Sequence, residues 1–177
     1  MAMVGLFWIT EESVHLGSPP DAEEHYVRIT SEGVQARDGD GTRAWPWSGL
    51  RSAVVEAAPV EGEAGGGGRF LAAVLEAVVT LGSSYGGGTP PQMLLVLESD
   101  DGTEEVRVWA AAKGYTSQEI ALSQRLLTRF REGAADPGTL MAWSRDHGGT
   151  PRPPEREALL REWVGTQNPG TEDGVQR

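Results

Sequence analysis

Hydrophobic and polar residues alternate along the first third of the chain, as they do in β-strands that turn one face to a core. Residues 4–10 predict a single strand, with Leu6 and Trp8 on one face and Phe7 and Ile9 on the other. Further short strands are expected at residues 14–16, 27–29, 34–36 and 51–58. A hairpin turn, indicated by Asp-Gly, and a single helical turn are expected at residues 37–43 and 48–50.

A second hairpin is expected later in the chain, where "QMLLVLES" and "EEVRVWAA" flank the turn "DDGT". In its return strand, alternation predicts that Val106 and Val108 point inward and that Arg107 and Trp109 point outward. Trp109 would then place a large aromatic ring at the surface. Exposed aromatic area often marks a contact site, so Trp109 is a candidate partner-binding residue. The alternative is that it packs beneath a later helix, beside Trp143.

The clearest helix follows this hairpin. Thr116 and Glu119 form a capping box, in which a hydroxyl and a carboxylate satisfy free backbone N–H groups, and Gly133 can end the helix. Its apolar stripe consists of Ile120, Leu126, Leu127 and Phe130. A short helix is expected next, with Asp136 as N-cap and Pro137 in its first turn. In a last helix of about ten residues, one face carries Leu159, Leu160, Trp163 and Val164.

An apolar stretch at residues 69–82 lies between two glycine runs and has almost no polar face. It predicts a helix that is buried on more than one side, because a surface helix needs a polar face. A helix of this length spans about 20 Å, too short to cross a bilayer core of about 30 Å. We expect it to lie at a contact between two protein chains, with burial inside its own domain as the alternative. Its candidate partner-binding residues are Phe70, Val74, Leu75 and Val78.

This order of elements predicts an α+β fold, in which a strongly bent antiparallel sheet leaves an open corner that the capped helix covers. The run "GVQARDGDGTRAWPWSGLRSAVVE" resembles bacterial pleckstrin-homology-like (PH-like) domains, in which a strand, a turn, an aromatic-proline-tryptophan-serine run and a further strand recur. "LLVLESDDGTEEVRVWA" and the helix after it resemble the last hairpin and C-terminal helix of that family. The resemblance covers roughly residues 4–57 and 92–132.

The resemblance implies a PH-like, partly open barrel capped by a C-terminal amphipathic helix. The expected organisation is a PH-like domain at residues 1–133, with the inserted helix at 69–82. A helical C-terminal extension is expected at residues 134–165, and a disordered tail at 166–177.

The net charge of −11 narrows the range of partners. Nucleic-acid-binding proteins neutralise phosphates with Lys and Arg, so we expect neither nucleic acid nor an anionic membrane surface to bind. Phosphoinositide-binding PH-like domains carry basic residues in the loop between the first two strands, whereas this loop holds Glu11 and Glu12, so that function does not transfer. No apolar run reaches the roughly 20 residues of a membrane span, and no signal peptide is recognisable. We expect a cytoplasmic protein without membrane insertion.

The sequence carries no catalytic signature. The adjacent Glu pairs at 11–12, 23–24 and 104–105 project to opposite faces of an extended chain, so they cannot converge on one substrate. Cysteine is absent, the three histidines lie far apart, and "DGDG" lacks the downstream Glu of a calcium loop. We therefore expect no catalytic residue, no metal site and no cofactor.

These features favour a non-catalytic protein–protein interaction module, an adaptor or regulatory subunit that binds another protein or forms a homodimer. The competing interpretation is a small-molecule-binding protein or an unrecognised enzyme, with a pocket between the sheet and the inserted helix. A metabolite that raises the melting temperature would favour this second class.

Overall fold

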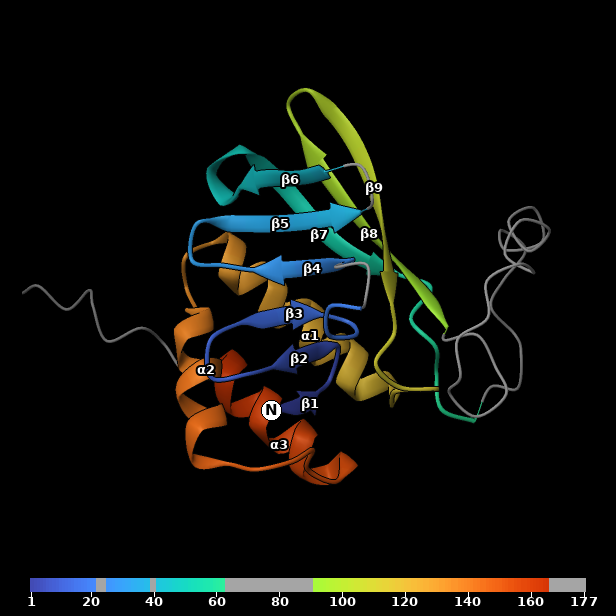
Figure 1. Ribbon diagram of the computed structural model, residues 1–177, viewed down its shortest axis with the longest axis vertical. Helices are drawn as coiled ribbons and strands as arrows, with labels where there is room; N and C mark the ends of the chain where they lie inside the picture. Colours follow the sequence, from blue (N-terminus) through green and yellow to red (C-terminus); the bar gives the residue numbers. More distant parts are fainter. Residues whose placement is uncertain (22–24, 39–40, 63–90, 166–177) are drawn as a thin grey trace, which may run out of the picture.

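The computed structural model describes residues 1–21, 25–38, 41–62 and 91–165. Within these residues the chain forms an α+β fold with two antiparallel sheets and three α-helices (Figure 1). The first sheet has six strands in sequence order: β1 (Ala2–Val4), β2 (Phe7–Ile9), β3 (Val14–Leu16), β4 (Tyr26–Ile29), β5 (Gly33–Asp38) and β6 (Gly41–Pro46). A 3₁₀ turn, η1 (Trp47–Gly49), leads into the second sheet, whose three strands are β7 (Leu50–Glu56), β8 (Gln92–Ser99) and β9 (Gly102–Trp109).

The helices are α1 (Ser117–Arg131), α2 (Pro137–Asp146) and α3 (Pro153–Gly165). In Figure 1 the strands of the second sheet cross behind the first sheet at a steep angle. Helix α3 lies at the β1 end of the first sheet, and α2 lies beside β2 and β3. Side chains from both sheets and all three helices form one hydrophobic core. The expected α+β class is confirmed, and the described residues form two antiparallel sheets and three helices with no closed barrel.

The single strand predicted at residues 4–10 is wrong. The chain reverses at Gly5 and Leu6, and the flanking residues pair as the antiparallel hairpin β1–β2. Gly5 has a φ of +58°, and a Cβ atom there would stand 2.2 Å from the hydroxyl oxygen of Ser123. The turn therefore requires glycine both for its backbone angle and for its close approach to α1. Alternation alone could not show this, because Leu6 is buried in the turn just as it would be in a strand.

Most other local predictions are confirmed. The strand at residues 14–16, the hairpin within 37–43 and the helical turn after Pro46 all form. Thr116 and Glu119 make the reciprocal capping box of α1. Asp136 caps α2, with Pro137 in its first turn. These elements follow from local chemistry, because turn residues and caps satisfy backbone groups within a few positions of one another.

Helix α1 packs against the second sheet and protects its edge strand. The Gln124 side chain donates to the carbonyl oxygen of Ala53 at 2.7 Å and accepts from the N–H of Val55 at 2.8 Å. The amide thus occupies two hydrogen-bonding groups of β7 that a further strand would otherwise use. One helical side chain closes this edge against strand addition between Ala53 and Val55.

The two sheets are joined through both ends of β9. At one end Glu104 accepts hydrogen bonds from the indole of Trp45, at 2.8 Å, and from Arg43, at 3.2 Å. At the other end the N–H of Ser18 donates to the carbonyl oxygen of Trp109 at 2.7 Å. A Cβ atom at Gly17 would approach that carbonyl to 2.2 Å, so glycine is needed for the close contact. The face of the second sheet that turns away from the core is thereby held in a defined position.

Candidate functional site

The second sheet turns one face to the core and the other outward. Alternate residues of all three strands are buried, so their neighbours form the outer face. In one row across this face, Val54 pairs with Val96 and Val96 with Glu105. In the next row, Glu56 pairs with Leu94 and Leu94 with Arg107.

Apolar side chains gather at the centre and one end of this outer face. Val54 is 38% exposed, one of the few large hydrophobic side chains with so much accessible surface among residues 1–21, 25–38, 41–62 and 91–165. Leu94, Val96 and Trp109 are half-buried. We call these four residues the outer apolar patch. Contiguous apolar area on a sheet face can mark a contact site, which makes this patch a candidate.

The outward direction predicted for Trp109 is confirmed by the burial pattern of β9, in which Val106 and Val108 are buried and Arg107 is exposed. Trp109 stands at the end of the strand, opposite Gln92 of β8. Trp143 packs elsewhere: its ring stacks on His147 with centroids 4.9 Å apart and meets Trp163 edge-on at 5.6 Å. The other four predicted contact residues, Phe70, Val74, Leu75 and Val78, lie outside the part of the chain that the structure describes.

A second candidate site is a surface depression of about 560 Å³ near the start of α3. Its walls include Met3 of β1, Glu61, Lys113, Pro153 and Arg156. Two chain segments that are far apart in sequence meet here, because Val60 and Tyr115 form a parallel β-bridge. Buried Tyr115 also fixes the loop before α1, since its hydroxyl accepts from the N–H of Ala111 at 2.9 Å. Burial raises the pKa of Tyr115 to about 12, so it stays neutral.

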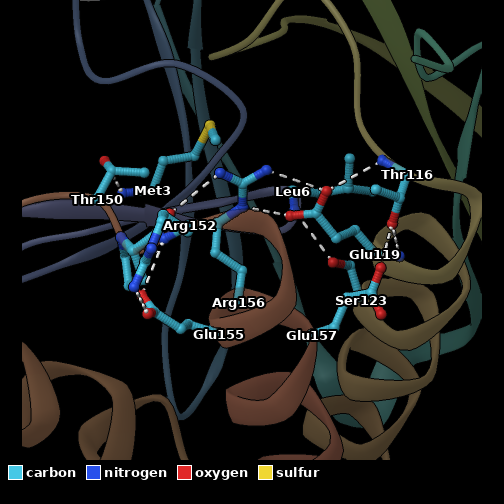
Figure 2. Close-up of polar contacts among 11 residues, drawn as sticks. Met3, Leu6, Thr116, Glu119, Ser123, Thr150, Arg152, Glu155, Arg156 and Glu157 are labelled. Atoms are coloured by element: carbon cyan, nitrogen blue, oxygen red, sulfur yellow. Dashed lines mark hydrogen bonds and ion pairs between the residues drawn. The ribbon is translucent and has the colours of Figure 1, made fainter. Parts of the chain in front are cut away.

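The wall of this depression rests on a buried ion pair between Arg156 of α3 and Glu119 of α1 (Figure 2). The Nε of Arg156 donates to Oε1 of Glu119, and a terminal nitrogen donates to Oε2 at 3.2 Å. Oε2 also accepts from the N–H of Thr116 at 3.0 Å, as the capping box requires. The Glu119 carboxylate is fully buried, and both of its oxygens are used.

Further contacts extend this network. The Thr116 hydroxyl donates to Glu157 of α3 at 2.7 Å, while it accepts from the Glu119 N–H at 3.0 Å. The N–H of Leu6 donates to the Ser123 hydroxyl at 3.0 Å (Figure 2). These hydrogen bonds and the Glu119–Arg156 ion pair join helix α3, the first hairpin and the start of α1. Each carboxylate oxygen of Glu119 already accepts at least one hydrogen bond within the fold.

A third cluster lies on β3 and β4, where His15 is buried beside Tyr26 and Arg28. The rings of His15 and Tyr26 meet edge-on at 5.7 Å, and the Arg28 guanidinium lies 5.2 Å from the centre of the Tyr26 ring. His15 Nε2 shares a hydrogen bond of 2.9 Å with the Ser13 hydroxyl, whereas Nδ1 has no hydrogen-bond partner among the residues that the structure describes. Burial, with a smaller contribution from the Arg28 charge, lowers the pKa of His15 to about 4.

This buried imidazole predicts a loss of stability in mild acid. The pKa of His15 is about 6.5 in the unfolded chain and about 4 in the folded one, so the unfolded state binds the proton more tightly. The contribution of neutral His15 is complete above pH 6.5 and decreases as the pH falls toward 4, by about 3 kcal/mol in all. Urea unfolding of the wild type and His15→Gln at several pH values measures this. A decline of equal slope in both proteins would contradict it, and His25→Gln, at a partly exposed position, is the control.

The sequence did not reveal the Glu119–Arg156 pair. The capping-box motif correctly predicted that Glu119 bonds Thr116 at the start of α1. It gave no indication that Glu119 also has a partner in another helix. A signal for Arg156 was present in the last helix, where residues 156, 160, 163 and 164 are all buried at helical spacing. An arginine in that apolar stripe indicates a buried charge that needs a partner. The prediction had instead placed Leu159 on this face, and Leu159 is only half-buried.

The remaining chemical candidates do not converge. Glu11 and Glu12 are exposed, and Glu104 serves as the acceptor for Trp45 and Arg43. Among the residues that the structure describes, no group of three or more acidic or histidine side chains could hold a metal ion. Within the same residues, no helix has the length and apolar character needed to cross a bilayer.

In comparisons with known proteins, no protein-family model, no curated protein and no solved structure matches this chain.

Proposed function

We propose that this protein is a non-catalytic interaction module, an adaptor or regulatory subunit that acts in the cytoplasm by binding another protein. The observation that carries the proposal is the outer apolar patch on the second sheet, where exposed Val54 lies on the same face as Leu94, Val96 and Trp109. An apolar centre with polar and charged residues around it is the usual anatomy of a protein contact surface.

The state of the buried polar groups supports a binding role over a catalytic one. Glu119 and Arg156 neutralise each other, and Tyr115 holds a loop through its hydroxyl. His15 is neutral and lies away from the depression. A general acid or base must reach a substrate, and these groups are instead bound within the fold.

The PH-like scaffold remains part of the proposal. It is supported by the order of the elements: antiparallel strands in sequence order, a three-stranded antiparallel meander and then a capped amphipathic helix. Helices α2 and α3, which follow residue 133, would be additions to that scaffold.

The test is affinity capture from the native host with quantitative comparison of three proteins. Val54→Glu places a charge in the outer apolar patch, and Thr42→Glu places the same charge at an exposed strand position of the first sheet. Both sites are accessible, so both variants should keep the wild-type melting temperature. We expect a protein captured by the wild type and by Thr42→Glu to be lost with Val54→Glu. With purified components, the affinity should fall at least about tenfold. Identical capture by all three would overturn the proposal.

The depression near α3 favours a second candidate function, the binding of a small molecule. It is an open depression of about 560 Å³, and Lys113 offers a cation at its wall. The inserted helix of the pocket predicted from the sequence lies outside the described residues. A metabolite that raises the melting temperature of the wild type but not of Lys113→Ala would support this function. A shift of equal size in both would place the metabolite elsewhere.

A further inference from the structure

The second sheet ends at β9, and one edge of this strand has unpaired backbone groups. The N–H of Ala110 donates to the carbonyl oxygen of Pro91 at 2.8 Å, which shows which positions of β9 are bonded to β8. Bonded positions alternate in an antiparallel pair, so every second residue of β9 directs its N–H and C=O groups away from β8. Trp109 confirms this alternation, because its carbonyl oxygen accepts from Ser18 on that side. The other three residues of this set, which we call the free edge, are Thr103, Glu105 and Arg107.

The free edge is open, whereas the opposite edge of the same sheet is closed. On β7 the Gln124 side chain bonds Ala53 and Val55. On β9 the three residues of the free edge are exposed, and within the described parts of the chain no hydrogen bond reaches their outward N–H and C=O groups. In Figure 1 the β8–β9 hairpin extends past β6, the last strand of the first sheet. A row of unpaired backbone groups of this kind is a template for a further strand.

The side chains along the free edge determine which strand can pair with it. Glu105 and Arg107 lie two residues apart on the outer face, and neither makes an ion pair among the residues that the structure describes. Opposite charges stabilise a cross-strand pair and like charges destabilise it. In an antiparallel strand, the complementary order is therefore an acidic residue followed two positions later by a basic one. A basic residue is also favoured beyond Thr103, where Asp101 is exposed at the tip of the hairpin.

We propose that the free edge binds an extended segment of a partner protein as an additional antiparallel strand, with an acidic residue opposite Arg107 and a basic residue opposite Glu105. This inference rests on the proposed function and names the part of the partner that is bound. In strand addition, backbone hydrogen bonds supply affinity and the alternate side chains supply specificity. A partner is favoured over a second copy because each copy carries a net charge of −11, which adds repulsion between copies. The added strand extends the sheet that carries the outer apolar patch, so one partner can contact both.

Two peptides of identical composition test the charge order with the full, isotope-labelled chain. The first, Thr-Glu-Val-Lys-Val-Lys-Lys with blocked ends, places its glutamate opposite Arg107 and its first lysine opposite Glu105. The second exchanges these two peptide residues, so like charges oppose one another at the same net charge. We expect a dissociation constant of about 1 mM or lower for the first peptide, and binding at least about tenfold weaker for the second. In nuclear magnetic resonance spectra, the amide signals of the free edge should shift and their solvent exchange should slow, because these amides gain hydrogen bonds.

A double variant should reverse this preference. Glu105→Lys with Arg107→Glu exchanges the two charges of the free edge and keeps the net charge of −11. Both side chains are exposed, so the melting temperature should not change. This variant should bind the second peptide and reject the first.

A proline pair tests the role of the backbone. Thr103→Pro removes one N–H of the free edge and should weaken the first peptide at least about tenfold. Thr42→Pro removes an N–H that points away from β5 on the edge strand β6, so it should leave binding unchanged.

Three results would overturn the inference: no binding of the first peptide at up to about 2 mM, equal affinities for the two peptides, or an unchanged preference in the double variant. Concentration-dependent shifts of the same amides without peptide would show that a second copy occupies the free edge, and would also overturn it. Val54 lies on β7, two strands from the free edge. If Val54→Glu loses a captured protein but neither peptide binds, the proposed function stands and only strand addition fails.

Discussion

Glu119→Ala is expected to lower the free energy of unfolding by about 3–5 kcal/mol, because it leaves the guanidinium of Arg156 buried without its counter-charge. Arg156 is 8% exposed and cannot regain full hydration without moving α3 away from α1. The substitution also removes the carboxylate that accepts from the Thr116 N–H, so the first turn of α1 loses half of its capping box. Denaturant unfolding followed by circular dichroism measures the change.

Two further variants separate the charge from the packing. Replacing both partners, as Glu119→Leu with Arg156→Leu, removes the unpaired charge and should cost less than Glu119→Ala alone. Arg152→Ala breaks an ion pair with Glu155 on the surface of the same region, where the arginine side chain is 84% exposed, and should leave stability unchanged. A double variant less stable than Glu119→Ala would show that the ion pair itself, rather than its broken half, stabilises the fold.

Phe130→Ala is expected to cost about 3–5 kcal/mol as well, for a different reason. The ring is 2% exposed and meets Phe7 edge-on with centroids 6.0 Å apart, so it connects α1 to the first hairpin. Its removal leaves a cavity that the rigid sheet cannot fill by collapse. The free energy of unfolding in urea measures the effect.

Ile120→Ala is the matched control for Phe130→Ala. The sequence placed both residues on one apolar stripe of α1, but Ile120 is only half-buried. Its truncation should therefore cost clearly less than that of Phe130. Equal losses at the two positions, or a loss below about 1 kcal/mol for Phe130→Ala, would contradict the packing of α1 against the sheets.

The sequence by itself determined the elements whose causes are local. Turn-forming residues between two alternating stretches predict where a hairpin forms, and Thr116 with Glu119 specifies the start of α1, because these capping residues satisfy backbone groups a few positions away. The alternation in β9 likewise determined that Val106 and Val108 face the core and that Arg107 and Trp109 do not. The α+β class followed from the order of these elements.

Only the tertiary structure decided how distant residues meet. The chain turns at Gly5, where the backbone has a positive φ and lies against Ser123. An alternating sequence pattern cannot distinguish such a turn from a continuous strand. Glu119 finds Arg156 across 37 positions, and Gln124 bonds the edge of β7 across about 70. The row of Glu56, Leu94 and Arg107 exists only once the strands pair in register. The physical reason is the same in each case: burial and charge pairing depend on three-dimensional neighbours, which local sequence does not specify.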